Sequence, residues 1–310
     1  MMPEVAILIP CFNEQETIGA VVAGFKSYVP NATVYVYDNA STDLTIERAR
    51  AAGAMVRSEP LRGKGYVVRR MFADIEADIY VLVDGDATYD AACAPKLIEM
   101  LENDCFDLVS AVRVDTSRNA YRSGHRFGNW LLTRLVARLF GKRFTDMLSG
   151  YRVMTRRFVK SFPAVSTGFE IETELTIHAL QMRVPIAEIT TLYGARPAGS
   201  ASKLRTISDG VRIMRMIMYL VKEEKPLEFF GAVSVLLAFL SLALGIPVVL
   251  EYLRTGLVPR LPTALLATGL VLLASLSLLC GLVLHTVTRG RIEMKRLCYL
   301  ALPARFPRDP

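Results

Sequence analysis

The sequence predicts a doubly wound α/β domain followed by a membrane part. The first observation is that short apolar runs alternate with helix-like segments over roughly the first 200 residues. The second is a buried strand, Ile79 to Val83, that runs directly into the carboxylates of Asp84, Asp86 and Asp90. The third is composition: 52% of the 310 residues are hydrophobic, and most of the excess lies after Phe229.

The net charge of +7 is compatible with nucleic acid, an anionic membrane surface or phosphorylated substrates as partners. The membrane segments favour the last two. We expect no nucleic-acid partner, because basic and aromatic residues do not alternate as they do on such surfaces. The five cysteines show no Cys-x-x-Cys spacing, which argues against a disulfide framework or zinc site and indicates a reducing compartment.

The first half of the chain alternates strands and helices. Val5 to Pro10 is the first predicted strand, and Asn13 is expected to cap the helix that follows, with Glu14 in its first turn. A second predicted strand, Thr33 to Tyr37, leads into the turn-rich segment Asp38 to Asp43.

Asp84 and Asp86 form the central candidate site. In open α/β sheets, ligands bind where the parallel strands end. Gly85 between the two carboxylates lets the backbone pass close by, so both can face one cation. Oxygen ligands without His or Cys favour Mg²⁺ or Mn²⁺ over zinc.

Basic residues supply candidate phosphate contacts. Lys64, in the loop Arg62 to Gly65, could approach a phosphate or a nucleotide base, although a plain loop is the alternative. Arg113 stands at the end of a predicted strand, Asp107 to Val112, where a ligand contact is expected. Further arginines follow, of which about half are expected on a solvated helix face: Arg118, Arg122, Arg126, Arg134 and Arg138.

Three later segments also carry charge. Asp146 and Arg152 flank a turn of small residues. The predicted helix start Phe169 to Glu174 has three acidic residues, which either complement the helix dipole or serve catalysis. The loop Arg196 to Lys203 has the cationic groups needed to grip a diphosphate.

The sequence after residue 203 predicts membrane attachment. A stripe of apolar residues over 204–226 predicts an amphipathic helix in the membrane interface, or one packed against the catalytic domain. Phe229 to Leu250 and Thr263 to Val287 are each long enough for a spanning helix of about 20 residues, and pair as a hairpin over 227–290. The basic flanks, including the tail 291–310, predict a multi-pass protein of the inner (cytoplasmic) membrane, with residues 1–203 and the C-terminus in the cytoplasm.

Taken in order, these segments resemble glycosyltransferase family 2, and within it the polyprenyl-phosphate glycosyltransferases related to dolichol-phosphate mannose synthase. The resemblance is carried by six stretches. They are Ile9-Pro-Cys-Phe-Asn-Glu14, Tyr37-Asp-Asn-Ala-Ser-Thr-Asp43, Gly63-Lys-Gly65, Asp84-Gly-Asp86, Asp146 to Arg152, and Arg196 to Lys203. Asn39 and Thr88 depart from the family pattern, where many relatives have Asp and Gln, so the base and sugar stay open.

The resemblance implies a GT-A type Rossmann-like nucleotide-sugar-binding domain and an inverting, metal-dependent hexosyltransferase. It would move a sugar from a UDP- or GDP-linked donor to a polyprenyl (undecaprenyl) phosphate at the bilayer, for a cell-envelope glycan, as a monomer or homo-oligomer. Asp86 would ligate Mg²⁺ or Mn²⁺, and Asp84 would hold the nucleotide or its metal. Asp146 and Arg152 would complete the catalytic set, with Asp146 more an orienting group than a base. Other implied substrate contacts are Pro10, Asn13, Glu14, Asp38, Lys64, Arg113, Arg126, Arg196, Ser202 and Lys203.

Two alternatives remain open at this stage. One is a glycosyltransferase with another membrane lipid as acceptor. The other is a catalytically inactive lipid-binding scaffold, which the intact Asp84 and Asp86 argue against. A processive polysaccharide synthase is disfavoured, because the lone Trp130 lies in no QxxRW motif and two spans make a poor polymer channel.

Overall fold

The structure, a computed structural model, describes residues 3–115, 134, 144–168, 170–194 and 222–303. It divides into two compact units: Met1–Gly210 together with Lys295–Pro310, and Val211–Met294. The predicted interfacial helix up to residue 221, the loop 196–203, and Arg126 with most of its neighbouring arginines lie outside the described residues.

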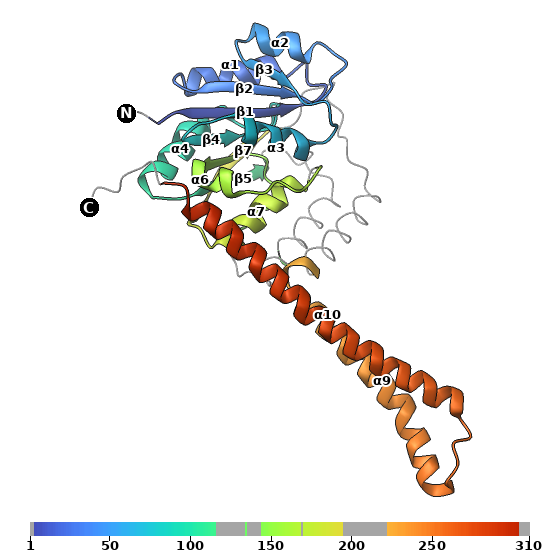
Figure 1. Cartoon of the computed structure of the whole chain (residues 1–310). Coiled ribbons are helices and arrows are strands. Elements are labelled where there is room, and N and C mark those ends of the chain that lie inside the picture. Colours follow the sequence, from blue (N-terminus) through green and yellow to red (C-terminus); the bar gives the residue numbers. More distant parts are fainter. Residues whose placement is uncertain (1–2, 116–133, 135–143, 169, 195–221, 304–310) are drawn as a thin grey trace. The chain divides into compact units, whose positions relative to one another are not determined.

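The first unit is built on a seven-stranded sheet with the order β3-β2-β1-β4-β6-β5-β7 (Figure 1). All described pairings are parallel except those of β6, which runs antiparallel to both β4 and β5. The strands are β1 (Val5–Cys11), β2 (Thr33–Asp38), β3 (Met55–Ser58), β4 (Ile79–Leu82), β5 (Leu108–Asp115), β6 (Arg152–Thr155) and β7 (Ile186–Tyr193).

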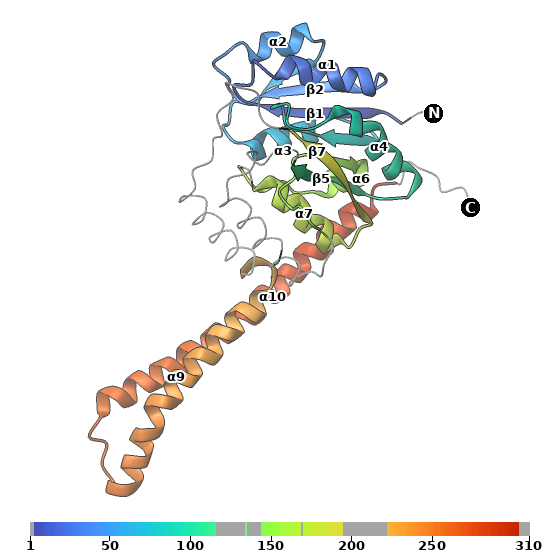
Figure 2. The same ribbon diagram turned by 180° about the vertical axis from the view of Figure 1, so that it is seen from behind.

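Helices pack in two groups, as Figures 1 and 2 show from opposite sides. One group contains α1 (Ile18–Tyr28), α2 (Thr45–Ala51), the 3₁₀ turn η1 (Ala91–Cys93) and α4 (Ala94–Asn103). The other contains α3 (Lys64–Asp74), α6 (Arg156–Ser161) and α7 (Ile171–Met182).

The two groups cover opposite faces of the sheet, because side chains alternate along each strand. Ile7 and Ile9 of β1 and Val81 of β4 share one apolar cluster with α1 and α4. Leu8, equally buried, lies outside that cluster, on the face where α3 packs. Helices on both faces of a mostly parallel sheet confirm the predicted α/β fold.

This topology places the candidate site. The chain leaves β1 for β2 on one side and reaches β4 on the other, so the strand order reverses between β1 and β4. Such switch points are where open α/β sheets bind ligands. Asp38 ends β2, and Asp84 lies two residues beyond the end of β4.

The expected role of Asn13 as a helix cap is wrong. Helix α1 begins only at Ile18. Asn13 adopts a left-handed backbone conformation (φ 51°), and its side-chain oxygen accepts a hydrogen bond from the Thr42 backbone at 2.8 Å. The side chain therefore links the first loop to the loop after β2 and does not cap the helix.

The second unit holds most of the two apolar helices, α9 (Pro226–Thr255) and α10 (Leu261–Leu300). Their most apolar windows have mean hydropathy of 2.6 and 2.3, so by length and composition both are candidate membrane spans. Both predicted spans lie inside these helices, although α10 runs well past the predicted end at Val287. Its buried positions are small residues seven apart, the repeat by which helices pair along a seam: Ala267, Ala274, Gly281 and Thr288.

The last turns of α10 belong to the first unit. The Tyr299 hydroxyl donates to Asp107 Oδ2 at 2.7 Å, and its ring lies 4.7 Å from the Arg157 guanidinium. Arg157 in turn binds Asp107, whose side chain is fully buried. Lys295 adds a hydrogen bond to Gln181 at 2.8 Å. Residues far along the chain thus satisfy a buried carboxylate at the start of β5.

We expect Tyr299→Phe to destabilise the chain, because it removes a donor from a buried charged acceptor, a loss of about 1–3 kcal/mol. The thermal midpoint of the full chain in detergent should fall by roughly 2–4 °C per kcal/mol. Tyr28→Phe is the matched control, since Tyr28 is 51% exposed. Equal midpoints for both variants would show that the Tyr299 contact adds no stability.

Candidate functional site

Asp38 closes β2 in a buried position, with 2% of the residue exposed. Its Oδ2 accepts a hydrogen bond from the Ser41 backbone at 3.0 Å. Its Oδ1 is buried and has no hydrogen-bond partner among the residues that the structure describes. A buried carboxylate oxygen left without a donor costs free energy, so a site that keeps one has an acceptor ready for a ligand N–H or O–H.

Asn39, a departure from the family pattern, has a structural explanation. Its amide nitrogen donates to the carbonyls of Glu59 (3.1 Å) and Leu61 (2.7 Å). Its amide oxygen accepts from the Gly63 backbone at 2.7 Å. A carboxylate could not donate to the two carbonyls. Asn39 therefore holds the loop that carries Lys64.

The segment Asp84 to Thr88 packs closely against Glu14 and Gly150, and a hydrogen bond within the segment orients Asp86. A side chain at Gly85 would overlap the Glu14 carboxylate, and one at Gly150 would overlap the Asp84 carboxylate. The Thr88 hydroxyl donates to Asp86 Oδ1 at 2.5 Å and the Thr88 backbone donates to it at 3.2 Å. Thr88 thus orients Asp86, which is 4% exposed.

The glycines beside Lys64 pack against another loop. A Cβ at Gly63 would overlap the carbonyl of Thr167, and a Cβ at Gly65 the carbonyl of Ser166. The loop is fastened by Glu174, whose carboxylate accepts from the backbone of Val165 (2.9 Å) and of Ser166 (2.8 Å). The starts of α3 and α7 are therefore in direct contact.

Lys64 lies between two carboxylates. Its ammonium donates to Asp84 Oδ1 and to Glu172 Oε1. Burial alone would lower the pKa of Lys64, but the carboxylates of Asp84 and Glu172 outweigh it and raise that pKa, so the ammonium is fully charged. Burial raises the pKa of Glu172, and the Lys64 charge opposes that shift. Of the three acidic residues expected to serve the helix dipole or catalysis, Glu172 and Glu174 thus have specific partners.

Arg113 and Asp146 form a bidentate ion pair. Arg113 Nε donates to Asp146 Oδ2 at 2.6 Å and Nη2 to Oδ1 at 2.8 Å. Burial would raise the pKa of Asp146, but hydrogen bonds and charge from Arg113 lower it below its ordinary value. Asp146 is therefore ionised at neutral pH and is a weak base. The Tyr193 ring lies 5.5 Å from the guanidinium.

Arg152, which the family resemblance places in the catalytic set, supports a backbone turn in the described structure. It is fully buried and donates to the carbonyls of Ser149 (3.0 Å) and Met147 (2.8 Å) and to the Thr176 hydroxyl. Burial lowers the pKa of Arg152 to about 10. The side chain holds the 147–149 turn against α7, while its Nη1 has no hydrogen-bond partner within the described ranges.

Several of these residues were not in the predicted site. Glu172 and Glu174 stand in a helix buried on nearly all sides, and acids inside such a helix need partners. Tyr89 accepts from the Gly150 backbone at 2.8 Å and packs edge-on against Tyr151. No spacing in the sequence indicates that Tyr89 supports the turn after Asp146.

Of the remaining predicted site residues, two are described by the structure and four are not. Pro10 is buried near the end of β1, and the Glu14 backbone donates to Thr45 at 2.9 Å. Arg126, Arg196, Ser202 and Lys203 lie outside the described residues.

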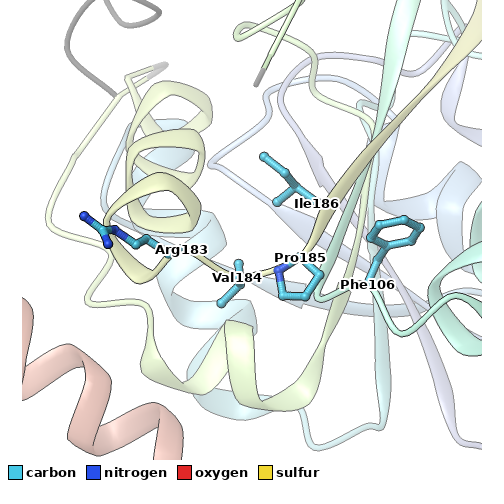
Figure 3. Close-up of a pocket in the computed structure, with 5 residues that line it drawn as sticks. All are labelled: Phe106, Arg183, Val184, Pro185 and Ile186. Carbon is cyan, nitrogen blue, oxygen red and sulfur yellow. The ribbon is translucent and has the colours of Figure 1, made fainter. Parts of the chain in front are cut away.

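A hollow of about 460 Å³ lies elsewhere, as Figure 3 shows. Its lining comes from the turn between α7 and β7 and from the residue two before β5. These segments precede the strands, at the opposite end from Asp84, and their side chains include one charged group, Arg183. The hollow therefore offers little of the chemistry that a charged ligand needs.

The fold and site define a class: an α/β domain with carboxylates at the switch point of its sheet, as in enzymes that bind nucleotides. Residues 6–162 match the family described as "Glycosyl transferase family 2", and the chain belongs to that family. The chain is accordingly a glycosyltransferase, as the motifs predicted.

Relatives and solved structures agree with this assignment. Glycosyltransferase AglJ of Haloferax volcanii is 34% identical over 249 residues, 80% of this chain and 82% of the relative. A dolichyl-phosphate hexose transferase of the same organism is 27% identical over 223 residues, 72% of this chain and 96% of the relative. Glucosyl-3-phosphoglycerate synthase from Mycobacterium tuberculosis, solved with Mn²⁺, UDP and glucosyl-3-phosphoglycerate, matches with TM-score 0.58 and 25% identity, over 72% of this chain and 80% of that chain. The predicted GT-A type fold is thereby confirmed.

We expect Gly65→Ala to destabilise the fold, because its methyl group would overlap the carbonyl of Ser166. Overpacking of this kind costs about 1–3 kcal/mol, which thermal unfolding can detect. Gly19→Ala in α1 is the control: nothing lies within 4 Å of its added Cβ. That change should stabilise by roughly 0.5–1 kcal/mol. A Gly65→Ala midpoint at or above wild type would contradict the packing role.

Proposed function

We propose that the chain transfers a sugar, with inversion, from a UDP- or GDP-linked donor to a polyprenyl phosphate, using a divalent cation. The observation that carries the proposal is the arrangement around Asp84: two carboxylates follow β4 at the switch point, beside Lys64 and the turn that carries Asp146. The relative named a dolichyl-phosphate hexose transferase supports the lipid phosphate as acceptor.

The donor set fits Mg²⁺ or Mn²⁺. Asp84 and Asp86 offer hard oxygen ligands, and such ions are held in many transferases by one or two carboxylates plus substrate phosphates. Among the described residues no group of three or more His, Cys, Asp or Glu could hold a metal, so the donor's diphosphate would supply the other ligands. When bound, the cation would offset charge on the departing diphosphate. The structural neighbour with Mn²⁺ and UDP supports the same reading.

The other residues take roles that follow from their contacts. Asp38, whose buried Oδ1 has no partner in the described part of the chain, would accept a hydrogen bond from the nucleoside. Arg113 would contact the acceptor phosphate, and Asp146 would hold its guanidinium in place. Arg196, Ser202 and Lys203 would close over the diphosphate, as the family resemblance implies.

The chemistry needs no covalent intermediate. An oxygen of the acceptor phosphate attacks the anomeric carbon opposite the diphosphate, the carbon–oxygen bond to the diphosphate breaks, and the nucleoside diphosphate leaves. Phosphate monoesters have a second pKa of about 6, so the acceptor is mostly a dianion at pH 7 and requires no general base. An ionised Asp146 is consistent with that.

The candidate spans support action at a membrane. Basic residues flank the outer ends of the α9–α10 pair: Lys222, Lys225, Arg289, Arg291, Lys295 and Arg296. Fewer lie in the link between the helices, so the catalytic unit and C-terminus would face the cytoplasm at the inner membrane. A soluble phosphorylated acceptor, as in the named neighbour, is the competing acceptor.

The direct test is a transfer assay on the full chain in detergent, with a panel of UDP- and GDP-sugars and Mg²⁺ or Mn²⁺. Nucleoside diphosphate release should require undecaprenyl phosphate and produce an inverted glycosyl phosphate. Undecaprenol, which lacks the phosphate, and 3-phosphoglycerate are the control acceptors. Release with 3-phosphoglycerate but not with the lipid would overturn the lipid-acceptor proposal.

Asp86→Asn should reduce transfer by at least about 10²-fold, because it removes charge where the diphosphate leaves. The asparagine has nearly the same shape, and its amide oxygen can still accept the hydrogen bond from Thr88. Asp90→Asn, four residues later, is the control; Asp90 accepts only a local hydrogen bond from Ala92 in the described contacts. Near-normal turnover of Asp86→Asn at saturating Mn²⁺ would remove Asp86 from the metal site.

Asp146→Asn should lose activity at pH 7 and regain little of it at pH 8.5. The pKa of Asp146 is lowered, so the wild-type group stays ionised between pH 6 and 9, and no proton removal by it sets the rate. Initial rates over this pH range test the point. Glu188→Gln is the control for a displaced turn, because Glu188 accepts from the Thr145 and Asp146 backbone, and its described hydrogen bonds do not include Arg113. Recovery of Asp146→Asn alone to the wild-type rate at high pH would identify Asp146 as a base.

A further inference from the structure

The group of Lys64, Asp84 and Glu172 contains one positive and two negative side chains. The Lys64 side chain is 9% exposed, that of Glu172 7% and that of Asp84 29%. Asp84 is thus the member that a ligand can reach. Glu172 lies deepest, and its described ion pair is with Lys64.

We propose that Glu172 is a positioning residue that balances the charge of Lys64, so that Asp84 keeps its negative charge for the metal and diphosphate of the donor. The inference rests on the proposed function and adds a residue that no motif names. With Glu172 ionised, Lys64 and Glu172 form a neutral pair and the group carries one net negative charge. Without it, the only described carboxylate left to balance Lys64 is Asp84, and the group is neutral.

The geometry favours this role over a contribution to the helix dipole. Glu172 and Glu174 both lie in the first turn of α7, so either one can complement the dipole. Glu174 binds backbone amides, whereas Glu172 binds a buried ammonium 108 residues away. A buried charge requires a partner of this kind, while an exposed first-turn acid does not.

The test measures UDP binding to the full chain by calorimetry, once in EDTA and once with saturating Mn²⁺; GDP is run in parallel. The ratio of the two affinities is the Mn²⁺ enhancement. Glu172→Gln keeps the shape but removes one negative charge a few ångströms from Asp84. At the effective dielectric of protein sites such a charge changes binding by at least roughly tenfold. We expect UDP to bind more tightly in EDTA, and the Mn²⁺ enhancement to fall by at least about tenfold.

The direction of the change in UDP affinity in EDTA separates this charge effect from structural loosening of the site. A loosened site would weaken UDP binding both in EDTA and in Mn²⁺ and leave their ratio near the wild-type value, which would overturn the proposal. Glu174→Gln is the matched control, since it frees the same loop without touching Lys64. Its enhancement should stay within about twofold of wild type, and Glu172→Asp, which keeps the charge, should recover most of it.

A second variant keeps the test decisive if Glu172→Gln does not fold. Lys64→Gln with Glu172→Gln removes the ion pair as a unit and leaves the Asp84 charge in place. Its Mn²⁺ enhancement should remain within about threefold of wild type, and collapse of the enhancement would overturn the proposal. Failure of the wild type to bind either nucleotide would instead refute the proposed function, so the two failures are distinguishable.

Discussion

The buried ammonium of Lys64 is the constraint on which the rest of the site depends. It joins the start of α3, the segment after β4 and the start of α7, which are far apart in the chain. Removing one partner of a buried ion pair typically costs about 3–5 kcal/mol, because a charge is left uncompensated. The three segments are therefore held together by a strong energetic requirement that lies within the chain itself.

The need for glycine at positions 63, 65 and 150 follows from the ion pairs of Lys64. For Lys64 to reach Glu172, the loop before α3 must lie against the loop before α7, where a side chain at Gly63 or Gly65 would overlap backbone carbonyls. Asp84 must then lie over Gly150, which the Tyr89 hydroxyl fixes through its backbone. Glycines of a motif that could admit a phosphate are thus needed first to let protein segments approach one another.

Much of this fold was predictable, because its signals are local. Apolar runs and turn residues identify strands, and the run before Asp84 places a carboxylate at a strand end. Glu172 was not predictable in the same way, since its partner lies 108 positions away and an acid at a helix start has an ordinary explanation. The antiparallel strand β6 was not predicted, because Arg152–Thr155 is only four residues long and directly follows a turn of small residues. Asn13 was misassigned because a contact across 29 residues replaced a local cap.

Two buried carboxylates at opposite ends of the sheet, Asp107 and Asp38, differ in how fully their oxygens are satisfied. At the start of β5, Asp107 is paired with Arg157 and also accepts from Thr155 (2.8 Å) and Tyr299 (2.7 Å), so its charge is balanced. At the carboxyl end, Asp38 keeps an oxygen without a donor in the described part of the chain, and the single ammonium of Lys64 faces two carboxylates. Structural polar groups are normally satisfied, and exceptions concentrate where a ligand binds. The sequence motifs lie at the carboxyl end, where these groups are incompletely satisfied. A nucleotide could donate a hydrogen bond to Asp38, and its cation could bind the carboxylate of Asp84.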